Sequence, residues 1–126
     1  MRIYISGPMT GILDGNREAF AKEAELWRSR GHFVVNPHDI TAVFGTVDEI
    51  TIAFGHVYGM FPLDTTEEKR AMTRLANSVM EADIAALRSC DTIVMLRGWQ
   101  SSRGAKKELE VALRNGLEVI LQEVCP

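Results

Sequence analysis

Apolar positions along the chain fall into two patterns that alternate. Short apolar runs at residues 2–6, 32–36, 92–96 and 118–122 predict four buried strands. Apolar residues at helical spacing predict a helix over residues 17–30, a longer one reaching residue 87 or 88, and a last one that stops at Gly116. The first strand, helix and second strand form a βαβ unit, which implies a parallel sheet with a right-handed crossover. The chain is therefore expected to adopt an α/β fold.

Local signals mark the ends of these helices. Asn16 is the expected N-cap of the first helix, and Thr65-Thr-Glu-Glu68 has the pattern of a capping box before the long one. Gly31 and Gly116 follow the first and last helices at the position that favours a left-handed glycine. These signals set the expected helix boundaries.

Residues 38–64 show no clear period. Aromatic residues and glycines are mixed there, and residues 50–54 could form a short strand or one arm of a hairpin. A segment of this kind in a compact domain usually serves as a lid, a binding loop or an oligomer contact. Alternatively, it is an apolar excursion that covers the sheet. The sequence leaves these alternatives open, and we treat 38–64 as an insert or lid within a single domain spanning residues 1–126.

The composition is that of an ordinary soluble domain. The chain has 126 residues and a formal net charge of −3, which argues against a dedicated nucleic-acid or membrane-surface binder because both need a basic face. No apolar run reaches the ~20 residues of a membrane helix, and no signal peptide is visible, so a cytoplasmic location is expected. Cys90 and Cys125 lack metal spacing and are expected to be free thiols. The three histidines also lack ligand spacing, so no metal site is expected.

Two loops follow predicted strands at the edge of the sheet where α/β proteins bind ligands. Residues 7–11 follow the first strand, and residues 98–104 follow the strand at 92–96. The second loop leads into a helix N-terminus, whose free N–H groups and partial positive charge hold anions. Neither loop is a P-loop or a dinucleotide-binding fingerprint, because the required spacings are absent. We expect the two loops to cradle one ligand.

Two acidic residues occupy positions that suggest chemistry. Glu108 is expected within about the first turn of the last helix, where the positive helix end favours the ionised carboxylate. Such a group serves as a nucleophile or general base, or it is a solvated residue at a helix start. Asp83 lies on or beside the apolar face of the preceding helix, which predicts either a raised pKa or a structural pair with Arg88 or Arg97. Glu110 is expected to be exposed.

Several stretches together resemble a known superfamily. They are residues 3–11 (IYISGPMTG), residues 31–37 (GHFVVNP), Asp83-Ile84, Cys90-Asp91, and residues 102–109 (SRGAKKEL). In order and spacing they resemble the nucleoside 2-deoxyribosyltransferase-like superfamily, more closely its small phage and prophage branch. That superfamily includes the transferases and the 2′-deoxynucleoside 5′-monophosphate N-glycosidases. The resemblance implies a flavodoxin-like parallel sheet of about four to five strands, flanked by helices in a three-layer sandwich.

The resemblance also implies a reaction. Glu108 falls on the family's nucleophile, which attacks C1′ of the 2-deoxyribose, displaces the base and forms an ester that water or a second base resolves. Asp83 matches an aspartate that orients the sugar or protonates the leaving base, and Tyr4 matches a tyrosine near the nucleophile. No cofactor is implied. Substrate binding is expected from the two loops and the end of the second strand, at Gly7, Pro8, Met9, Thr10, Gly11, Pro37, Gly98, Trp99, Ser101, Ser102, Arg103 and Gly104.

In the nucleotide-hydrolysing members, small residues before the glutamate hold the 5′-phosphate, and here these are Ser101, Ser102 and Gly104. Pro8 and Thr10 depart from the serine and basic residue that those members carry in the first loop, although Arg103 could substitute. The expected partner is a small-molecule nucleoside or nucleotide, with no nucleic acid and no membrane, and a homo-oligomer is favoured.

The chemistry of the residues fits this expectation. Breaking an N-glycosidic bond passes through an oxocarbenium-like state that a carboxylate stabilises and then traps, as in retaining glycosidases. An aspartate with a raised pKa is suited to donating the proton. Two other functions stay open: a nucleotide-binding module without turnover, and a partner-binding protein whose interface is the aromatic segment from Phe44 to Phe61.

Overall fold

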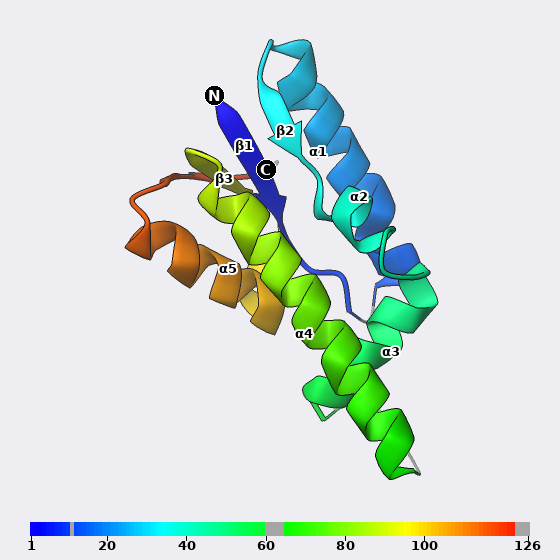
Figure 1. Cartoon of the computed structure of the whole chain (residues 1–126). Coiled ribbons are helices and arrows are strands. Elements are labelled where there is room, and N and C mark those ends of the chain that lie inside the picture. Colours follow the sequence, from blue (N-terminus) through cyan, green and yellow to red (C-terminus); the bar gives the residue numbers. More distant parts are fainter. Residues whose placement is uncertain (11, 60–64, 123–126) are drawn as a thin grey trace.

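A parallel sheet of four strands lies at the centre of the molecule (Figure 1). The computed structural model describes residues 1–10, 12–59 and 65–122. The strands are β1 (Arg2–Ser6), β2 (Phe33–Val35), β3 (Thr92–Met95) and β4 (Glu118–Leu121). Their order is β2-β1-β3-β4, and all three pairs are parallel. Each strand falls within one of the predicted runs, so the predicted α/β fold is confirmed.

Helices cover both faces of this sheet (Figure 1). The four longest are α1 (Arg17–Ser29), α3 (Val47–Val57), α4 (Thr66–Arg88) and α5 (Arg103–Arg114). Along β1, Ile3 and Ile5 pack with Phe20 of α1 on one face. Tyr4 lies between them in sequence, so it points to the other face, where it packs with Leu87 of α4. This alternation along the buried central strand gives the three layers that the flavodoxin-like expectation requires.

The predicted ends of α1 and α5 agree closely with the structure. Gly31 and Gly116 adopt positive φ angles of 89° and 73° just past the two helices, as expected for glycines at this position. Asn16 precedes α1 as predicted, but its side chain makes no capping hydrogen bond. Its φ of 62° is left-handed, whereas a capping side chain requires an extended N-cap. Asn16 is therefore the N-cap residue of α1, as predicted, but its side chain does not cap the helix.

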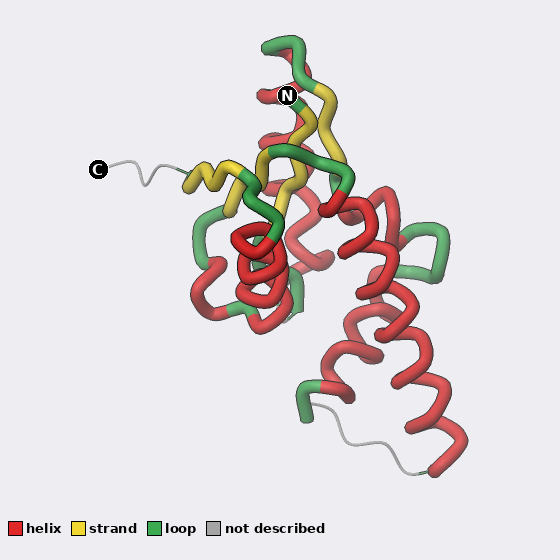
Figure 2. Tube along the Cα trace, turned by 60° about the vertical axis from the view of Figure 1, so that its left-hand side comes forward, coloured by secondary structure: helices red, strands yellow, loops and turns green. Residues whose placement is uncertain are grey.

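The segment after β2 is helical, and the strand predicted for residues 50–54 is wrong. The short helix α2 (Pro37–Thr41) and α3 occupy it. α3 begins at a capping box in which Thr46 and Glu49 each bond the other's backbone N–H at 3.2 Å. This Thr-x-x-Glu pattern is a helix-start signal in the sequence. The β-branched residues favour a strand locally, but α3 packs along α4, and that contact stabilises the helix (Figure 2). The remainder of the insert, residues 60–64, lies outside the described residues.

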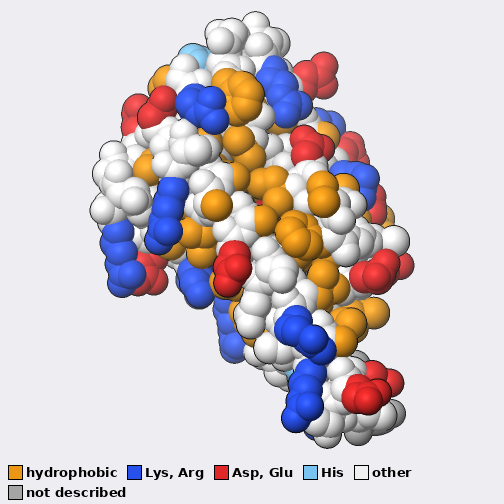
Figure 3. All heavy atoms as spheres, in the orientation of Figure 1, with side chains coloured by type: hydrophobic (Ala, Val, Ile, Leu, Met, Phe, Trp, Pro, Cys, Tyr) orange, Lys and Arg blue, Asp and Glu red, His pale blue; other side chains and the backbone are white. Residues whose placement is uncertain are grey.

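The expected homo-oligomer stays a prediction, and the surface shows where apolar side chains are exposed. Apolar side chains form a band across the face shown in Figure 3, with charged side chains on either side. In and before α3, the large apolar side chains that are exposed are Val43, Phe44, Ile52 and Val57. None of the described helices has the length and apolar content needed to cross a membrane.

Gly7 connects β1 to the loop that follows it, and it packs against Leu96. A Cβ at Gly7 would lie 2.7 Å from Leu96 Cβ, closer than any relaxed carbon contact. We expect Gly7→Ala to lower the free energy of unfolding by about 1–3 kcal/mol, because β1 or β3 has to move. Denaturant titration measures the loss. Gly45→Ala is the matched control, since its Cβ would meet only the flexible Glu49 side chain at 3.4 Å. Equal stability of the two variants would contradict this packing argument.

Candidate functional site

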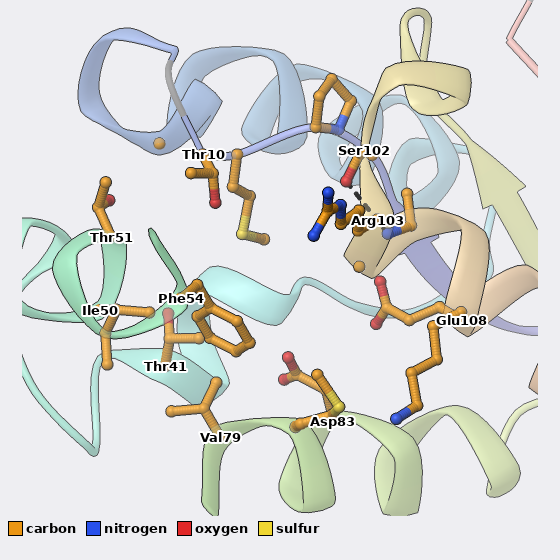
Figure 4. Close-up of a pocket in the computed structure, with 18 of the residues that line it drawn as sticks. Thr10, Thr41, Ile50, Thr51, Phe54, Val79, Asp83, Ser102, Arg103 and Glu108 are labelled. Carbon is orange, nitrogen blue, oxygen red and sulfur yellow. Dashed lines mark hydrogen bonds between the residues drawn. The ribbon is translucent and has the colours of Figure 1, made fainter. Parts of the chain in front are cut away.

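One cavity of about 270 Å³ opens at the carboxyl ends of β1 and β3. The loop after β1 forms one wall and α4 forms the opposite wall, with α3 at one end and the start of α5 at the other (Figure 4). Both predicted loops contribute, so the structure brings the two predicted halves of the cradle together. The position follows from parallel topology, which places all strand carboxyl ends at one edge.

Glu108 points into this cavity from the second turn of α5 (Figure 4). The phenol of Tyr4 donates a hydrogen bond to Oε2 of Glu108, and Ser6 Oγ donates to Oε1 at 2.8 Å. Both donors belong to β1, two residues apart, and therefore share one face of the strand. Glu108 thus has each carboxylate oxygen held by a hydroxyl. Ser6 was not predicted, although its spacing from Tyr4 is the signal that could have identified it.

Burial governs the charge of Glu108. Loss of hydration raises the pKa of its carboxyl to about 7, while the hydrogen bonds from Tyr4 and Ser6 act in the opposite direction. The prediction that the helix end keeps Glu108 ionised is wrong. α5 begins at Arg103, so Glu108 lies beyond the first turn, where the helix dipole has little effect. The two hydroxyl donors favour the ionised form instead.

Tyr4 is suited to be a permanent donor. Its side chain is fully buried, and burial together with the negative charge of Glu108 raises its pKa well above the ordinary value. The phenol therefore keeps its proton at physiological pH and holds Glu108 Oε2. The predicted association of Tyr4 with Glu108 is present in the structure.

Asp83 enters the same cavity from α4 (Figure 4). Burial, and then the nearby charge of Glu108, raise the pKa of its carboxyl to about 8. An ion pair with Arg88 or Arg97 would lower that pKa. The raised pKa therefore argues against the structural pair that the sequence left open. Within the described residues, Asp83 Oδ1 is buried and has no hydrogen-bond partner.

The surroundings of the two carboxyl groups set the order in which they ionise. Two hydroxyl donors hold the charged form of Glu108, whereas Asp83 Oδ1 has no partner among the described residues, and the charge of Glu108 raises the pKa of Asp83. Glu108 is therefore expected to ionise first, opposite a neutral Asp83. The cavity therefore holds one carboxylate and one proton donor near neutral pH.

Tyr58 and Arg103 form the wall between α3 and α5. Arg103 NH1 donates to the Tyr58 carbonyl oxygen at 3.3 Å, and its guanidinium carbon lies 5.6 Å from the centre of the Tyr58 ring. Tyr58 Oη is the other buried side-chain polar atom without a partner in the described part of the chain. Unpaired buried polar groups cost about 1–3 kcal/mol each. A ligand or an ordered water in the cavity would supply the missing partners.

The predicted substrate-binding residues divide into two groups. Gly7, Pro8, Met9, Thr10, Ser101, Ser102, Arg103 and Gly104 line the cavity. Pro37, Gly98 and Trp99 are not in its lining and have places in the fold. Pro37 starts α2, Gly98 turns the chain with a φ of 83°, and Trp99 packs on the core. Gly11 lies outside the described residues.

The serines near α5 already have protein partners. Ser102 Oγ accepts from Ala105 N at 3.1 Å as the N-cap of α5, and Ser101 Oγ donates to the Gly98 carbonyl at 2.8 Å. Arg103 is exposed at the rim and is the cation of this loop. An anionic ligand group at this end would therefore meet Arg103 more readily than the serine hydroxyls.

The end of the cavity away from Glu108 was predicted only at Thr10. Thr41, Ile50, Thr51 and Phe54 also line it, and Phe54 lies between Ile50 and Asp83 (Figure 4). Thr41 Oγ1 donates to the His38 carbonyl at 3.2 Å. These residues come mostly from α2 and α3. Sequence reasoning missed them because it left this segment irregular. The cavity thus has a charged end and a neutral end.

His38 also borders the cavity, and it holds the loop after β1. Its Nε2 lies 2.9 Å from the Gly15 carbonyl, and burial lowers its pKa. Among the described residues, no group of three or more His, Cys, Asp or Glu side chains could hold a metal ion. Cys90 is a buried free thiol, whereas Cys125 lies outside the described residues.

The raised pKa values predict how the stability of the free protein depends on pH. The unfolded carboxyl groups titrate near 4, whereas Asp83 and Glu108 titrate at about 8 and about 7 in the folded state. Across this window the folded state therefore binds more protons than the unfolded state. The free energy of unfolding is highest while both carboxyl groups are protonated, and it falls as the pH rises through their folded pKa values. We expect Asp83→Asn to raise the free energy of unfolding at pH 9 by about 1–3 kcal/mol, with little change at pH 4.

Denaturant titrations at the two pH values measure this difference. Asp91→Asn is the control of opposite sign, because a hydrogen bond from the Arg2 backbone N–H lowers the pKa of Asp91. Its contribution is present above the unfolded pKa, so the substitution destabilises at pH 9. An Asp83→Asn effect that is equal at pH 4 and pH 9 would contradict the burial of an ionisable group.

Comparison with known proteins identifies a family. Residues 1–61 and 65–121 match the family described as Domain of unknown function (DUF4406), and the chain belongs to this family. Tyr4, Ser6, Asp83 and Glu108 all lie within the matched residues. No curated protein and no solved structure matches the chain.

Proposed function

We propose that this chain cleaves or exchanges the N-glycosidic bond of a 2′-deoxynucleoside or its 5′-monophosphate, with Glu108 as nucleophile and Asp83 as proton donor. The observation that carries the proposal is the pairing of two carboxyl groups in one cavity. Glu108 is held by two hydroxyl donors, and burial and then the charge of Glu108 raise the pKa of Asp83. The resemblance to the nucleoside 2-deoxyribosyltransferase-like superfamily supports the same assignment of roles.

The first step forms an ester. A carboxylate oxygen of Glu108 attacks C1′, the C1′–N bond breaks, and its electron pair stays on the base nitrogen. Asp83 transfers its proton to the base, so a neutral base leaves. Positive charge develops on the sugar in the transition state, and the carboxylate of Glu108 stabilises it before closing the bond. The products are a deoxyribosyl ester of Glu108, the free base and ionised Asp83.

The second step releases the enzyme. Water, or the N–H of a second base, attacks C1′, and the C1′–O bond to Glu108 breaks with its electron pair returning to the carboxylate. Asp83, now a carboxylate, accepts the proton from the attacking group. Hydrolysis and transfer thus use one machinery and differ in the acceptor. Tyr4 and Ser6 keep the carboxylate aligned in both steps.

The cavity suits a ligand of this class. Its volume of about 270 Å³ is that of a small-molecule site and too small for a polynucleotide. In this proposal the sugar lies at the end with Glu108 and Asp83, and the base extends toward Phe54 and the threonines, which line the other end. Phe54 offers an aromatic side chain for contact with the base. A 5′-phosphate, where present, is placed toward Arg103.

A substrate panel tests the proposal. The purified chain is incubated with the four deoxynucleosides, their 5′-monophosphates and the matching ribonucleosides, and base release is followed by chromatography. We expect release from one or more deoxy substrates. Adding a free acceptor base separates the two outcomes, because transfer yields a new nucleoside or nucleotide, whereas hydrolysis yields free deoxyribose or its 5-phosphate. No release from any member of the panel would reject the proposed reaction.

A nucleotide-binding module without turnover is the second candidate. The unpartnered atoms Tyr58 Oη and Asp83 Oδ1 favour a bound ligand and do not by themselves require a reaction. This candidate predicts tight binding of a nucleotide that survives Glu108→Gln, with no product formed. Calorimetric titration of both proteins, run beside the substrate panel, distinguishes the two functions.

A further inference from the structure

The Tyr58 hydroxyl has no part in the reaction steps above, yet its surroundings place it at the reacting end of the cavity. A Cβ built on Gly104 would lie 3.4 Å from Tyr58 Oη. Gly104 precedes Glu108 by four residues on α5, so the two positions share one face of the helix. Burial, and then the negative charge of Glu108, raise the pKa of Tyr58. Tyr58 therefore lies at the end of the cavity that Glu108 lines.

Contacts of its backbone and of its ring hold Tyr58 in this position. Its backbone carbonyl accepts from Arg103 NH1, and its ring contacts the Arg103 guanidinium. The Phe54 ring lies one helical turn earlier on α3, and the centres of the Phe54 and Tyr58 rings are 6.0 Å apart. A well-held donor that is buried and lacks a partner is preorganised for a ligand atom.

The ligand atom that fits belongs to the sugar. The atoms next to the nucleophile are those around C1′, whereas the base extends to the opposite end of the cavity. We infer that the Tyr58 hydroxyl donates a hydrogen bond to a hydroxyl oxygen of the bound sugar and selects ligands that carry it. This inference rests on the proposed function for the orientation of the ligand. The 3′-hydroxyl and the 5′-hydroxyl are the two candidates on a deoxynucleoside.

Stability of the free protein separates a ligand contact from a structural role. Tyr58→Phe removes a hydroxyl that has no protein partner, so the melting temperature of the free chain is expected to stay the same or rise. A hydroxyl that holds the fold together would show a clear fall. Such a fall would contradict the inference.

A coupling measurement identifies the contacted hydroxyl. Base release is measured with a deoxynucleoside and with its 3′-deoxy and 5′-deoxy analogues, for the wild type and for Tyr58→Phe. We expect Tyr58→Phe to lower kcat/KM for the full substrate by about 10–100-fold and to cause no further loss with one of the analogues. Tyr4→Phe is the matched control, since it acts on the nucleophile and should weaken turnover of all three substrates alike. Equal losses from Tyr58→Phe with all three would overturn the inference.

Binding keeps the inference testable if the proposed reaction fails. The same three ligands are titrated into Glu108→Gln and into Glu108→Gln with Tyr58→Phe, and the dissociation constants are compared. Coupling to one sugar hydroxyl without turnover would reject the reaction and support the contact. Turnover without coupling would reject the contact and leave the reaction standing. Neither binding nor turnover would overturn both.

Discussion

Glu108→Gln is expected to reduce base release by about 10³–10⁶-fold, as removal of an enzymic nucleophile commonly does. The amide keeps the size of the side chain, so Tyr4 and Ser6 retain an oxygen acceptor. It lacks the negative charge that stabilises the sugar cation, and it is a poor nucleophile toward C1′. Single-turnover assays with the most active deoxynucleoside of the panel measure the loss. The ester on residue 108 should also be absent by mass spectrometry of the quenched reaction.

Glu110→Gln provides the matched control for that experiment. It lies on the same helix two residues further on, is exposed, and forms an ion pair with Arg114. The substitution changes net charge equally but leaves the cavity untouched, so base release should stay close to that of the wild type. Full release by Glu108→Gln, or an equal loss in both variants, would remove Glu108 from the role of nucleophile.

Asp83→Asn is expected to lower kcat/KM by about 10²–10⁴-fold, the usual contribution of a general acid. The wild-type pH profile should be bell-shaped, with its maximum between about 7 and 8. Below that range Glu108 becomes protonated and loses its nucleophilic form. Above it Asp83 loses the proton that the leaving base needs. Asp83→Asn has no such proton at any pH, so its remaining activity should lack the alkaline decline.

A substrate with an activated leaving group checks this assignment. An N7-methylated purine deoxynucleoside already carries positive charge on its base and departs without accepting a proton. Its cleavage by Asp83→Asn should therefore be close to wild type, while the ordinary purine shows the full loss. If both substrates lose activity equally, Asp83 acts in binding the sugar and not as the proton donor.

The sheet and its main helices were predictable because each has a local cause. β1 and β3 are short runs rich in β-branched residues, with a buried side chain at nearly every position. α1 ends at Gly31, and α4 begins after Thr65, whose hydroxyl accepts from Glu68 N at 3.1 Å. α3 was misjudged because Ile50, Thr51 and Ile52 are β-branched. The helical state of α3 depends on its contact with α4, and a short stretch of sequence does not show which tertiary contacts it will make.

The site was predictable in part for a similar reason. Parallel topology brings Tyr4, Asp83 and Glu108 to one edge, and their positions follow from elements that the sequence marks clearly. The charge state of Glu108 was not predictable, since it depends on burial and on the hydroxyls of β1. Tyr58 was missed because its place beside Gly104 requires α3 to cross to the start of α5.

The division of the cavity wall between elements has a consequence for how the family can diversify. The sheet, α4 and α5 carry Tyr4, Asp83 and Glu108, while one continuous stretch, residues 46–58, supplies Ile50, Thr51, Phe54 and Tyr58. Under the proposed function, most groups that would contact the base therefore lie on a stretch of the chain separate from the two carboxyl groups. Exchange of residues 46–58 between two members of the family is expected to change which ligand is bound, while Asp83 and Glu108 stay in place.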